Sequence, residues 1–303
     1  MNAAMNAPMK TVLVTGATGN VGRTVVAALR ARRTPVRALV RDEAKARRLL
    51  GADVDLAHGD FADPVSLRCA LRGVDAVFLT SADGPDKVAH ENAVIDAAST
   101  AWIKRIVKLS SPHVEIGSEP AFWDWHARIE QHLHTSGVPS VRLRSNYLMS
   151  NLLAAADAVA GTGQLFAPAG DARIAMIDPA DIGATAAVLL TEDGHDGRTY
   201  ELTGPAALSY HDIAAELSAV TGRKISYVDI PDDTARAVLA ASGAPDWLVT
   251  NLVTMFGKLR NGAGAHITDT VRELTGCQPR PLGQWLHNHA QAFTTSRPHP
   301  AKA

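Results

Sequence analysis

Short apolar runs alternate with amphipathic segments through the first half of the chain. Buried strands are predicted where β-branched and aliphatic residues cluster, at 11–15, 35–40, 54–57, 76–79, 105–109 and 140–143. Helices are predicted between them, at 24–29, 41–50, 67–71, 90–98 and 124–134. Parallel strands need such crossover connections. The pattern therefore predicts an α/β fold with a doubly wound parallel sheet covered by helices on both faces.

The pattern changes after residue 150. A loop is predicted at 161–170, and a helix over 180–190 is predicted to be capped by Asp178 ahead of Pro179. Strands are predicted at 199–202 and 225–228, with a helix between them at 209–220 that begins with a capping-box pattern. Residues 232–290 are predicted to be mostly helical. The last part of the chain is therefore a smaller, mainly helical region.

A glycine-rich turn joins the strand at 11–15 directly to the helix at 24–29. Gly16 allows a tight turn, Gly19 lets the backbone approach a pyrophosphate, and Gly22 lets the helix pack against the strand. The helix N-terminus adds amide donors and partial positive charge. The alternative is a tight turn without a ligand. The strand before and the helix after it favour a dinucleotide site, with these predicted contacts: Gly16, Thr18, Gly19, Asn20, Val21 and Gly22.

The end of the second predicted strand bears on the choice of dinucleotide. An NAD site usually has an acidic residue there for the ribose 2′-hydroxyl, whereas a guanidinium suits a 2′-phosphate. Arg41 is the first residue beyond this strand, and the stretch from Arg23 to Arg48 contains nine basic and two acidic residues. A solvated basic helix is the alternative, and Asp42 leaves room for NAD(H). The sequence favours NADP(H) over NAD(H).

Two more strand ends are predicted to face the same crevice. Asp60 and Phe61 follow the third strand, where the carboxylate would accept from the adenine amino group and the ring would pack on the base. Leu79, Thr80 and Ser81 follow the fourth strand, near the expected place of the nicotinamide ribose. A turn aspartate and a helix cap are the alternatives.

Composition sets limits on other functions. A formal net charge of -1 and a pI of about 6.9 give no global attraction to nucleic acid or membrane. The two cysteines, Cys69 and Cys277, are far apart, which favours a reducing cytoplasm. We find no long apolar run, no HExxH or Cys/His cluster, no G-x-S-x-G and no P-loop. We therefore expect a cytoplasmic protein without a metal site and with a small-molecule substrate, and without a direct nucleic-acid or membrane partner.

The predicted helix at 124–134 carries the candidate catalytic residue. An apolar stripe of Phe122, Trp125, Ile129 and Leu133 is predicted to face the core. His126 lies beside this stripe with Glu130 one turn further on. Packing is the alternative role for a lone histidine there. Proximity to the helix N-terminus is expected to lower its pKa, leaving a neutral hydrogen-bond donor.

Aromatic side chains around this helix are candidates for a substrate pocket. Trp123 and Trp125 are predicted to wall an aromatic substrate, with plain packing as the alternative. His113 follows Ser110-Ser111-Pro112 and is predicted to face the same pocket.

Several motifs together resemble the NmrA-like family of atypical short-chain dehydrogenases/reductases, which includes NAD(P)H:quinone oxidoreductases and NADPH-sensing regulators. They are TGATGNVGR, VRALVRD, GDFADP, VKLSS, WHARIEQHLHTSGVPSVRLRSNYLMSNLL, IDPADIGATAAVLL and YELTGPAALSYHDIAAELSAVTGRK. The resemblance spans roughly residues 10–293. Conventional relatives use a Tyr-x-x-x-Lys pair, which this chain lacks. The resemblance places a lone Lys or His at the matching helix position, here His126, in contact with cofactor or substrate.

The resemblance also implies a domain arrangement. It predicts a Rossmann-type NAD(P)-binding domain at 10–150, to which 173–203 return, and a substrate or lid subdomain at 151–172 and 204–295. Asn146 and Tyr147 are implied to line the mouth of the active site. Residues 1–9 and 296–303 are predicted to be a disordered leader and tail.

Three functions follow as hypotheses. The leading one is an NADPH-dependent reductase that transfers hydride to a small conjugated acceptor such as a quinone or enone, with His126 or a water supplying the proton. The second is a non-catalytic NADP(H)-binding redox sensor that regulates a partner protein, which would need no proton donor. The third is a biosynthetic tailoring enzyme of the same fold. A homodimer is compatible with each.

Overall fold

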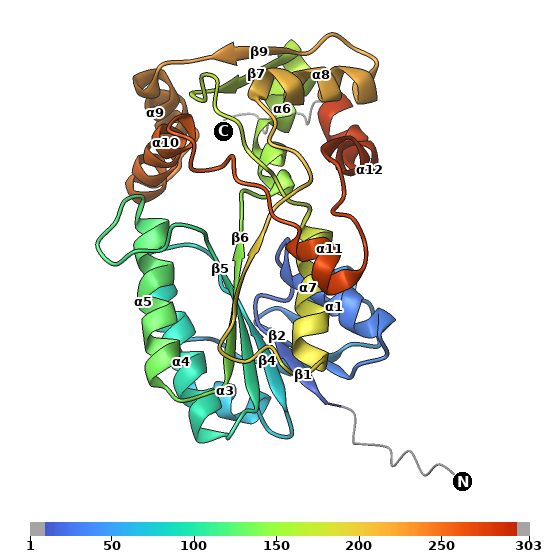
Figure 1. The fold of residues 1–303 in the computed structure, drawn as a ribbon, viewed down its shortest axis with the longest axis vertical. Coiled ribbons are helices and arrows are strands. Elements are labelled where there is room, and N and C mark those ends of the chain that lie inside the picture. The colour runs from blue at the N-terminus through green and yellow to red at the C-terminus, as the bar shows by residue number, and fades with distance from the viewer. Residues whose placement is uncertain (1–9, 296–303) are drawn as a thin grey trace.

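A seven-stranded parallel sheet forms the centre of the computed structural model, which describes residues 10–295 (Figure 1). Its strands lie in the order β3-β2-β1-β4-β5-β6-β8. The strands are β1 (Val12–Val14), β2 (Val36–Val40), β3 (Asp55–His58), β4 (Ala76–Leu79), β5 (Arg105–Ser110), β6 (Ser140–Ser145) and β8 (Thr199–Leu202). The predicted fold class is confirmed. The order reverses between β1 and β4, where ligands bind in such sheets. The predicted leader and tail lie outside the described residues.

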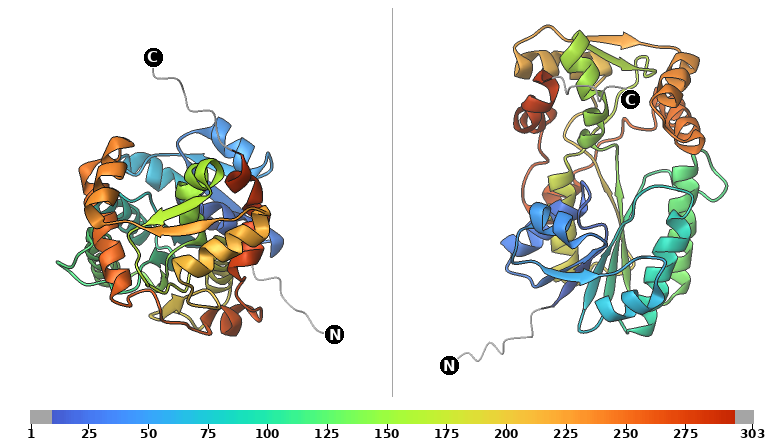
Figure 2. Two further views of the ribbon diagram at one scale, coloured as in Figure 1. Left: turned by 90° about the horizontal axis from the view of Figure 1, so that it is seen from above. Right: turned by 180° about the vertical axis from the view of Figure 1, so that it is seen from behind.

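Helices cover both faces of this sheet (Figures 1 and 2). One face carries α1 (Gly22–Ala31), α2 (Glu43–Leu50) and α7 (Pro179–Thr191), and the other carries α3 (Pro64–Ala70), α4 (Lys87–Thr100) and α5 (Ala121–Thr135). A methyl group added at Gly183 of α7 would lie 2.7 Å from the carbonyl of Thr24 in α1. Glycine therefore sets the close approach of these two helices.

A second unit lies beyond the carboxyl ends of the strands (Figure 1). It contains η1 (Met149–Ala155), α6 (Ala156–Thr162), α8 (Tyr210–Thr221), α9 (Asp232–Ala241), α10 (Asp246–Arg260), α12 (Leu282–Thr294) and the parallel pair β7 (Gln164–Ala167) and β9 (Ser226–Asp229). Its apolar core includes Ile213, Leu217 and Trp285. The loop prediction for 161–170 is wrong, because β7 lies there. No helix among residues 10–295 is both long and apolar enough to span a bilayer.

Several local predictions are confirmed. Asp178 accepts a hydrogen bond from the amide of Ala180 at the start of α7, and α8 begins with a full capping box between Ser209 and Asp212. β8 pairs with β6 and so returns to the main sheet. One element differs from the predicted division: α11 (Thr270–Thr275) packs against α7 and β8, although it lies in the range 204–295.

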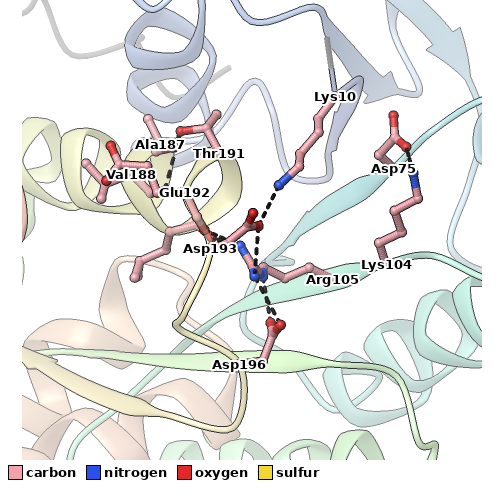
Figure 3. A network of polar contacts seen from close by, with 11 residues as sticks. Lys10, Asp75, Lys104, Arg105, Ala187, Val188, Thr191, Glu192, Asp193 and Asp196 are labelled. Atoms are coloured by element: carbon pink, nitrogen blue, oxygen red, sulfur yellow. Dashed lines mark hydrogen bonds and ion pairs between the residues drawn. The ribbon is translucent and has the colours of Figure 1, made fainter. Parts of the chain in front are cut away.

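Arg105, the first residue of β5, makes a buried network of contacts at the end of the sheet opposite the crevice (Figure 3). Arg105 in β5 is 6% exposed, and its guanidinium donates to the carboxylate of Asp196 at 2.6 and 3.0 Å. It also donates to the carbonyl oxygen of Leu189, at the end of α7. The hydrogen bonds to Asp196 raise the pKa of Arg105, although burial opposes this. Arg105 therefore fixes the end of α7 and the loop between α7 and β8 to the sheet.

We expect Arg105→Ala to lower the free energy of unfolding by about 2 kcal/mol, because it leaves the buried carbonyl oxygen of Leu189 without a donor and removes the ion pair with Asp196. Lys104→Ala is the matched control. The Lys104 side chain is 71% exposed and pairs with Asp75 at 2.7 Å, so its loss should cost less than about 1 kcal/mol. Urea unfolding of both variants measures the difference. Equal losses would contradict the role given to Arg105.

Candidate functional site

A cavity of about 1200 Å³ lies between the main sheet and the second unit. Its walls come from the ends of β1, β2, β4 and β5, from α5, and from the segment 145–168. α9 and α10 close it on the side of the second unit. The crevice at the reversal of strand order therefore opens into one continuous space.

The glycine loop forms the floor of this cavity. Gly16 has a φ of 57°, which favours glycine, and a methyl group there would lie 2.9 Å from the carbonyl oxygen of Thr80. A methyl group at Gly22 would lie 2.1 Å from the carbonyl oxygen of Gly16. Gly22 thus brings α1 against the start of the loop itself. These close approaches leave no room for side chains at the two ends of the loop.

The loop also presents donors at a helix N-terminus. The amides of Gly19 and Arg23 are used within the loop, by the carbonyl oxygens of Gly16 and Gly19 respectively. Within residues 10–295, the backbone amides of Thr18, Asn20 and Val21 donate no hydrogen bond. Together with the positive end of α1, these amides suit a pyrophosphate. The loop residues therefore fit a dinucleotide.

Arg41 and Asp42 have different roles at the end of β2. Arg41 lines the cavity with a side chain that is 77% exposed and lies 3.8 Å from the carboxylate of Asp60. Asp42 caps α2 by accepting from the amide of Lys45 at 2.8 Å. Its carboxylate accepts the cap hydrogen bond, which leaves Arg41 as the charged side chain at the end of β2 that lines the cavity. This arrangement suits a 2′-phosphate.

The predicted adenine contacts are only partly brought together. Phe61 lines the cavity and stacks on His90 with ring centroids 5.5 Å apart. Asp60 is not among the lining residues, because its carboxylate accepts from the amide of Ala62 at 2.9 Å and faces Arg41. Leu79 packs in the core below α3 and α4 and does not line the cavity. The binding roles of these residues stay predictions.

Thr80 and Ser81 lie where β4 meets the glycine loop. The hydroxyl of Thr15 donates to the carbonyl oxygen of Thr80 at 2.7 Å and accepts from its amide at 2.9 Å, which joins β1 to β4. Both Thr80 and Ser81 line the cavity. The hydroxyl of Ser81 donates to Glu91 at 2.9 Å. Ser81 therefore connects the cavity to a buried group of charges.

That group consists of Glu91 between Lys87 and Lys108. Lys108 and Glu91 are fully buried, and Lys87 is 2% exposed. The ammonium nitrogen of Lys108 lies 2.8 Å from Oε2 of Glu91, and that of Lys87 lies 2.9 Å from Oε1. The contact between Lys108 and Oε2 of Glu91 is an ion pair, but its angles do not meet those of a hydrogen bond. The carboxylate of Asp83 lies 3.3 Å from the ammonium of Lys87, so two anions balance the two cations. Lys87 lines the cavity, and Lys108 and Glu91 lie behind its wall.

His126 extends this cluster into the cavity. Its Nδ1 lies 3.0 Å from Nζ of Lys108, and the ring lines the cavity. An ammonium group has only donors, so Nδ1 must accept and the proton of the neutral ring is on Nε2. Glu130, predicted to share a face with His126, instead binds Arg144 at 2.7 Å and Ser110 at 2.6 Å.

The pKa values of this cluster are strongly shifted. Burial lowers the pKa of Lys108 to about 8, although Glu91 opposes this. Burial opposes ionisation of Glu91, but Lys108 and Lys87 lower its pKa to about 2. The pKa of His126 lies well below its usual range, because of burial and then the repulsion from Lys108. The predicted direction for His126 is confirmed, with burial as its largest cause.

The mouth residues are fixed by contacts with the second unit. Asn146 lines the cavity and donates from Nδ2 to the carbonyl oxygen of Gly264 at 2.9 Å. Tyr147 also lines the cavity, and burial raises the pKa of its phenol. Nε2 of His113 lies 2.7 Å from the carbonyl oxygen of Ala263. All three are brought to the same space.

The two tryptophans separate. Trp123 is 7% exposed, lines the cavity and packs against His113 with ring centroids 5.1 Å apart. Trp125 is not among the lining residues and packs between Phe122 and Trp247 at 5.6 and 5.7 Å. Phe122 lines the cavity, although it was predicted to face the core with Trp125. Trp123 and Trp125 point in different directions because two residues span about half a turn of helix, so only the Trp123 ring lines the cavity.

Lys87, Glu91 and Lys108 are missing from the sequence prediction. A signal exists in the run Arg105-Ile106-Val107-Lys108-Leu109, where a lysine sits inside a strand buried on both faces. Such a charge needs a buried partner. The sequence alone does not show that this partner is Glu91, because only the adjacency of β5 and α4 brings the two together.

The chain and its fold match known proteins. Residues 8–277 match the model of the NmrA-like family. The chain is 36% identical over 282 residues to NAD(P)H azoreductase of Xenophilus azovorans, covering 93% of this chain and 99% of that protein. It is 38% identical over 286 residues to the (4-alkanoyl-5-oxo-2,5-dihydrofuran-3-yl)methyl phosphate reductase of Streptomyces griseus, covering 93% and 99%. The structure resembles an NADPH-dependent quinone oxidoreductase of Escherichia coli complexed with NADPH, with a TM-score of 0.83 at 30% identity, covering 92% and 99%.

Proposed function

The chain belongs to the NmrA-like family, and we propose that this NAD(P)H-dependent oxidoreductase uses NADPH to reduce a small conjugated acceptor such as a quinone or enone. The similar proteins are named for the reduction of azo compounds, a dihydrofuranone and quinones. These acceptors share a conjugated, electron-poor centre. The observation that carries the proposal for this chain is His126, held by Lys108 in the wall of a cavity that begins at a dinucleotide cradle.

The cofactor half of the proposal rests on three features. Gly16 and Gly22 form a cradle that side chains would fill, the amides of Thr18, Asn20 and Val21 have no acceptor within the described residues, and Arg41 lies at the end of β2. The loop would hold the pyrophosphate and Arg41 the 2′-phosphate. When bound, NADPH supplies the hydride.

The acceptor needs a proton as well as the hydride, and His126 would donate it from Nε2 to the acceptor oxygen. As Nε2 loses its proton, the ammonium of Lys108 would pass one of its own protons to Nδ1. The ring then stays neutral, and Lys108 is left as a neutral amine that regains a proton from water after turnover. Glu91 and Lys87 hold the ammonium of Lys108 in place. Trp123 and Phe122 would pack on the flat face of the acceptor. The residues orient the acceptor and supply one proton.

A redox sensor would need no such proton donor. The buried contact between Lys108 and Nδ1 of His126 favours an enzyme, because an ionisable pair with shifted pKa values at a cleft has a use in acid catalysis. A tailoring enzyme would use the same machinery with a different acceptor. The sensor therefore remains the alternative to test.

Turnover separates these alternatives. Purified protein is mixed with NADPH or NADH and a panel of small quinones and enones, and the loss of reduced-nicotinamide absorbance is followed. We expect oxidation that requires both protein and acceptor and is faster with NADPH. Tight NADPH binding without oxidation by any acceptor would support the sensor instead.

Arg41 provides a second prediction. We expect Arg41→Ala to raise the Kd for NADPH about tenfold to a hundredfold and to leave the Kd for NADH nearly unchanged, because only NADPH has the 2′-phosphate. Arg48→Ala is the control, since Arg48 lies on α2 outside the cavity. Fluorescence titration measures both constants. Equal weakening of the two cofactors would remove Arg41 from 2′-phosphate recognition.

A further inference from the structure

The cavity continues past the cofactor cradle and His126 into the second unit. There its walls come from η1, α6, β7, α9 and α10. No residue from position 151 onward that lines it, among those the structure describes, carries a charge. The part near the cradle differs, since Arg41, Asp83 and Lys87 line it. One end of the cavity therefore suits charged phosphates and the other an apolar group.

Large apolar side chains on two helices face this second part. Leu248, Leu252 and Met255 follow one another at i, i+4 and i+7 on α10, and Leu239 of α9 lines the same part of the cavity. All four are only half-buried, because they border the cavity instead of packing fully on other side chains. Apolar surface of this kind gains from contact with an apolar ligand.

Two contacts between α10 and α5 fix the apolar side chains of α10 in position relative to the ring of His126. Oδ1 of Asn251 in α10 accepts from the amide of Ala121, the first residue of α5, at 2.5 Å. Trp247 of α10 packs against Trp125 of α5. Because His126 is on α5, these contacts hold Leu248, Leu252 and Met255 of α10 in place relative to the helix that carries the proposed proton donor. A molecule that reaches His126 can thus extend along α10.

We propose that the acceptor carries an alkyl or isoprenoid chain on its conjugated centre, and that the wall formed by Leu239, Leu248, Leu252 and Met255 binds this chain. The inference rests on the proposed function, because the conjugated centre must lie at His126 for the chain to lie along α10. Val238 marks the far rim, since it lines the cavity and is 60% exposed. Longer chains would reach solvent there.

A series of acceptors with one ring tests this proposal. 1,4-Benzoquinones with no chain and with n-alkyl chains up to decyl are compared, each below the concentration at which it aggregates. We expect kcat/KM to rise up to about fourfold for each of the first methylenes, mainly through KM, and then to level off. The quinone without a chain reports the proposed function separately.

Two variants locate the effect. Leu252→Asn places an amide in the wall formed by Leu239, Leu248, Leu252 and Met255. It should reduce the increase in kcat/KM that the decyl chain gives by about tenfold or more. Leu49→Asn is the matched control, because Leu49 is 44% exposed on α2 and does not line the cavity. Its kcat/KM should depend on chain length as that of the wild-type protein does. Melting temperatures of both variants show whether they are folded.

The outcomes are distinct. Turnover of the chainless quinone with no dependence on chain length would overturn the bound chain and leave the proposed function standing. A dependence that Leu252→Asn and Leu49→Asn change equally would also overturn it. If no quinone or enone is turned over at all, the proposed function fails, and the inference that rests on it fails too.

Discussion

His126→Ala is expected to lower kcat by about 10²-fold to 10⁴-fold while the Kd for NADPH changes little. The range is that of a lost general acid. In the proposed mechanism the ring would supply the Nε2 proton to the acceptor, and the glycine loop and Arg41 would hold the cofactor without it. Single-turnover kinetics at saturating NADPH measure the chemical step directly, apart from product release.

His132→Ala is the control for this substitution. His132 is on the same helix, α5, but its Nε2 lies 2.7 Å from the carboxylate of Asp96, at the surface. We expect the kcat of the His132→Ala variant to stay within about twofold of the wild-type value, as is usual for a substitution at the surface. Unchanged turnover in His126→Ala would remove His126 from the mechanism.

Lys108→Met is expected to lower kcat about tenfold to a hundredfold, because His126 loses a charge-assisted donor to Nδ1. It should also change the pH profile. A lysine with a pKa of about 8 is an ammonium below that pH and neutral above it. The kcat of the wild-type protein should therefore fall as the pH rises through about 8, and this fall should be absent in Lys108→Met.

Lys104→Met is the matched control, since Lys104 lies four residues earlier and its side chain is 71% exposed. Its pH profile should follow that of the wild type. Glu91 keeps Lys87 as a partner in Lys108→Met, at 2.9 Å, so the variant is not left with an unpaired buried carboxylate. A profile in Lys108→Met that still falls near pH 8 would show that another group controls the reaction.

Much of the fold is predictable from sequence because local and global signals agree. The central strands β1, β2, β4 and β5 are rich in apolar residues and each is followed by a helix, and Asp178 and Ser209 mark the starts of α7 and α8. β7 is missed, since four residues beside glycines and a proline carry no clear period, and its partner β9 lies about 60 residues further along the chain. Only the folded chain shows that pairing.

The site divides in the same way. Position alone predicts that Gly16, Gly22 and Arg41 lie at the cavity, because a strand–turn–helix fixes where its ends lie. The charges behind His126 are not, because Lys108 and Glu91 come from different elements and meet only through packing. Trp123 and Trp125 show the same limit at smaller scale, since helix phase decides which ring faces the cavity.

The most direct test of hydride transfer follows the hydrogen itself. NADPH with deuterium at both C4 positions of the nicotinamide is incubated with the protein and an enone, and the product is examined by mass spectrometry and NMR. We predict one deuterium on the β-carbon for each NADPH consumed, since a hydride bound to carbon does not exchange with water. NADPH bound but not consumed, or a reduced product without deuterium, would contradict direct hydride transfer to a conjugated acceptor.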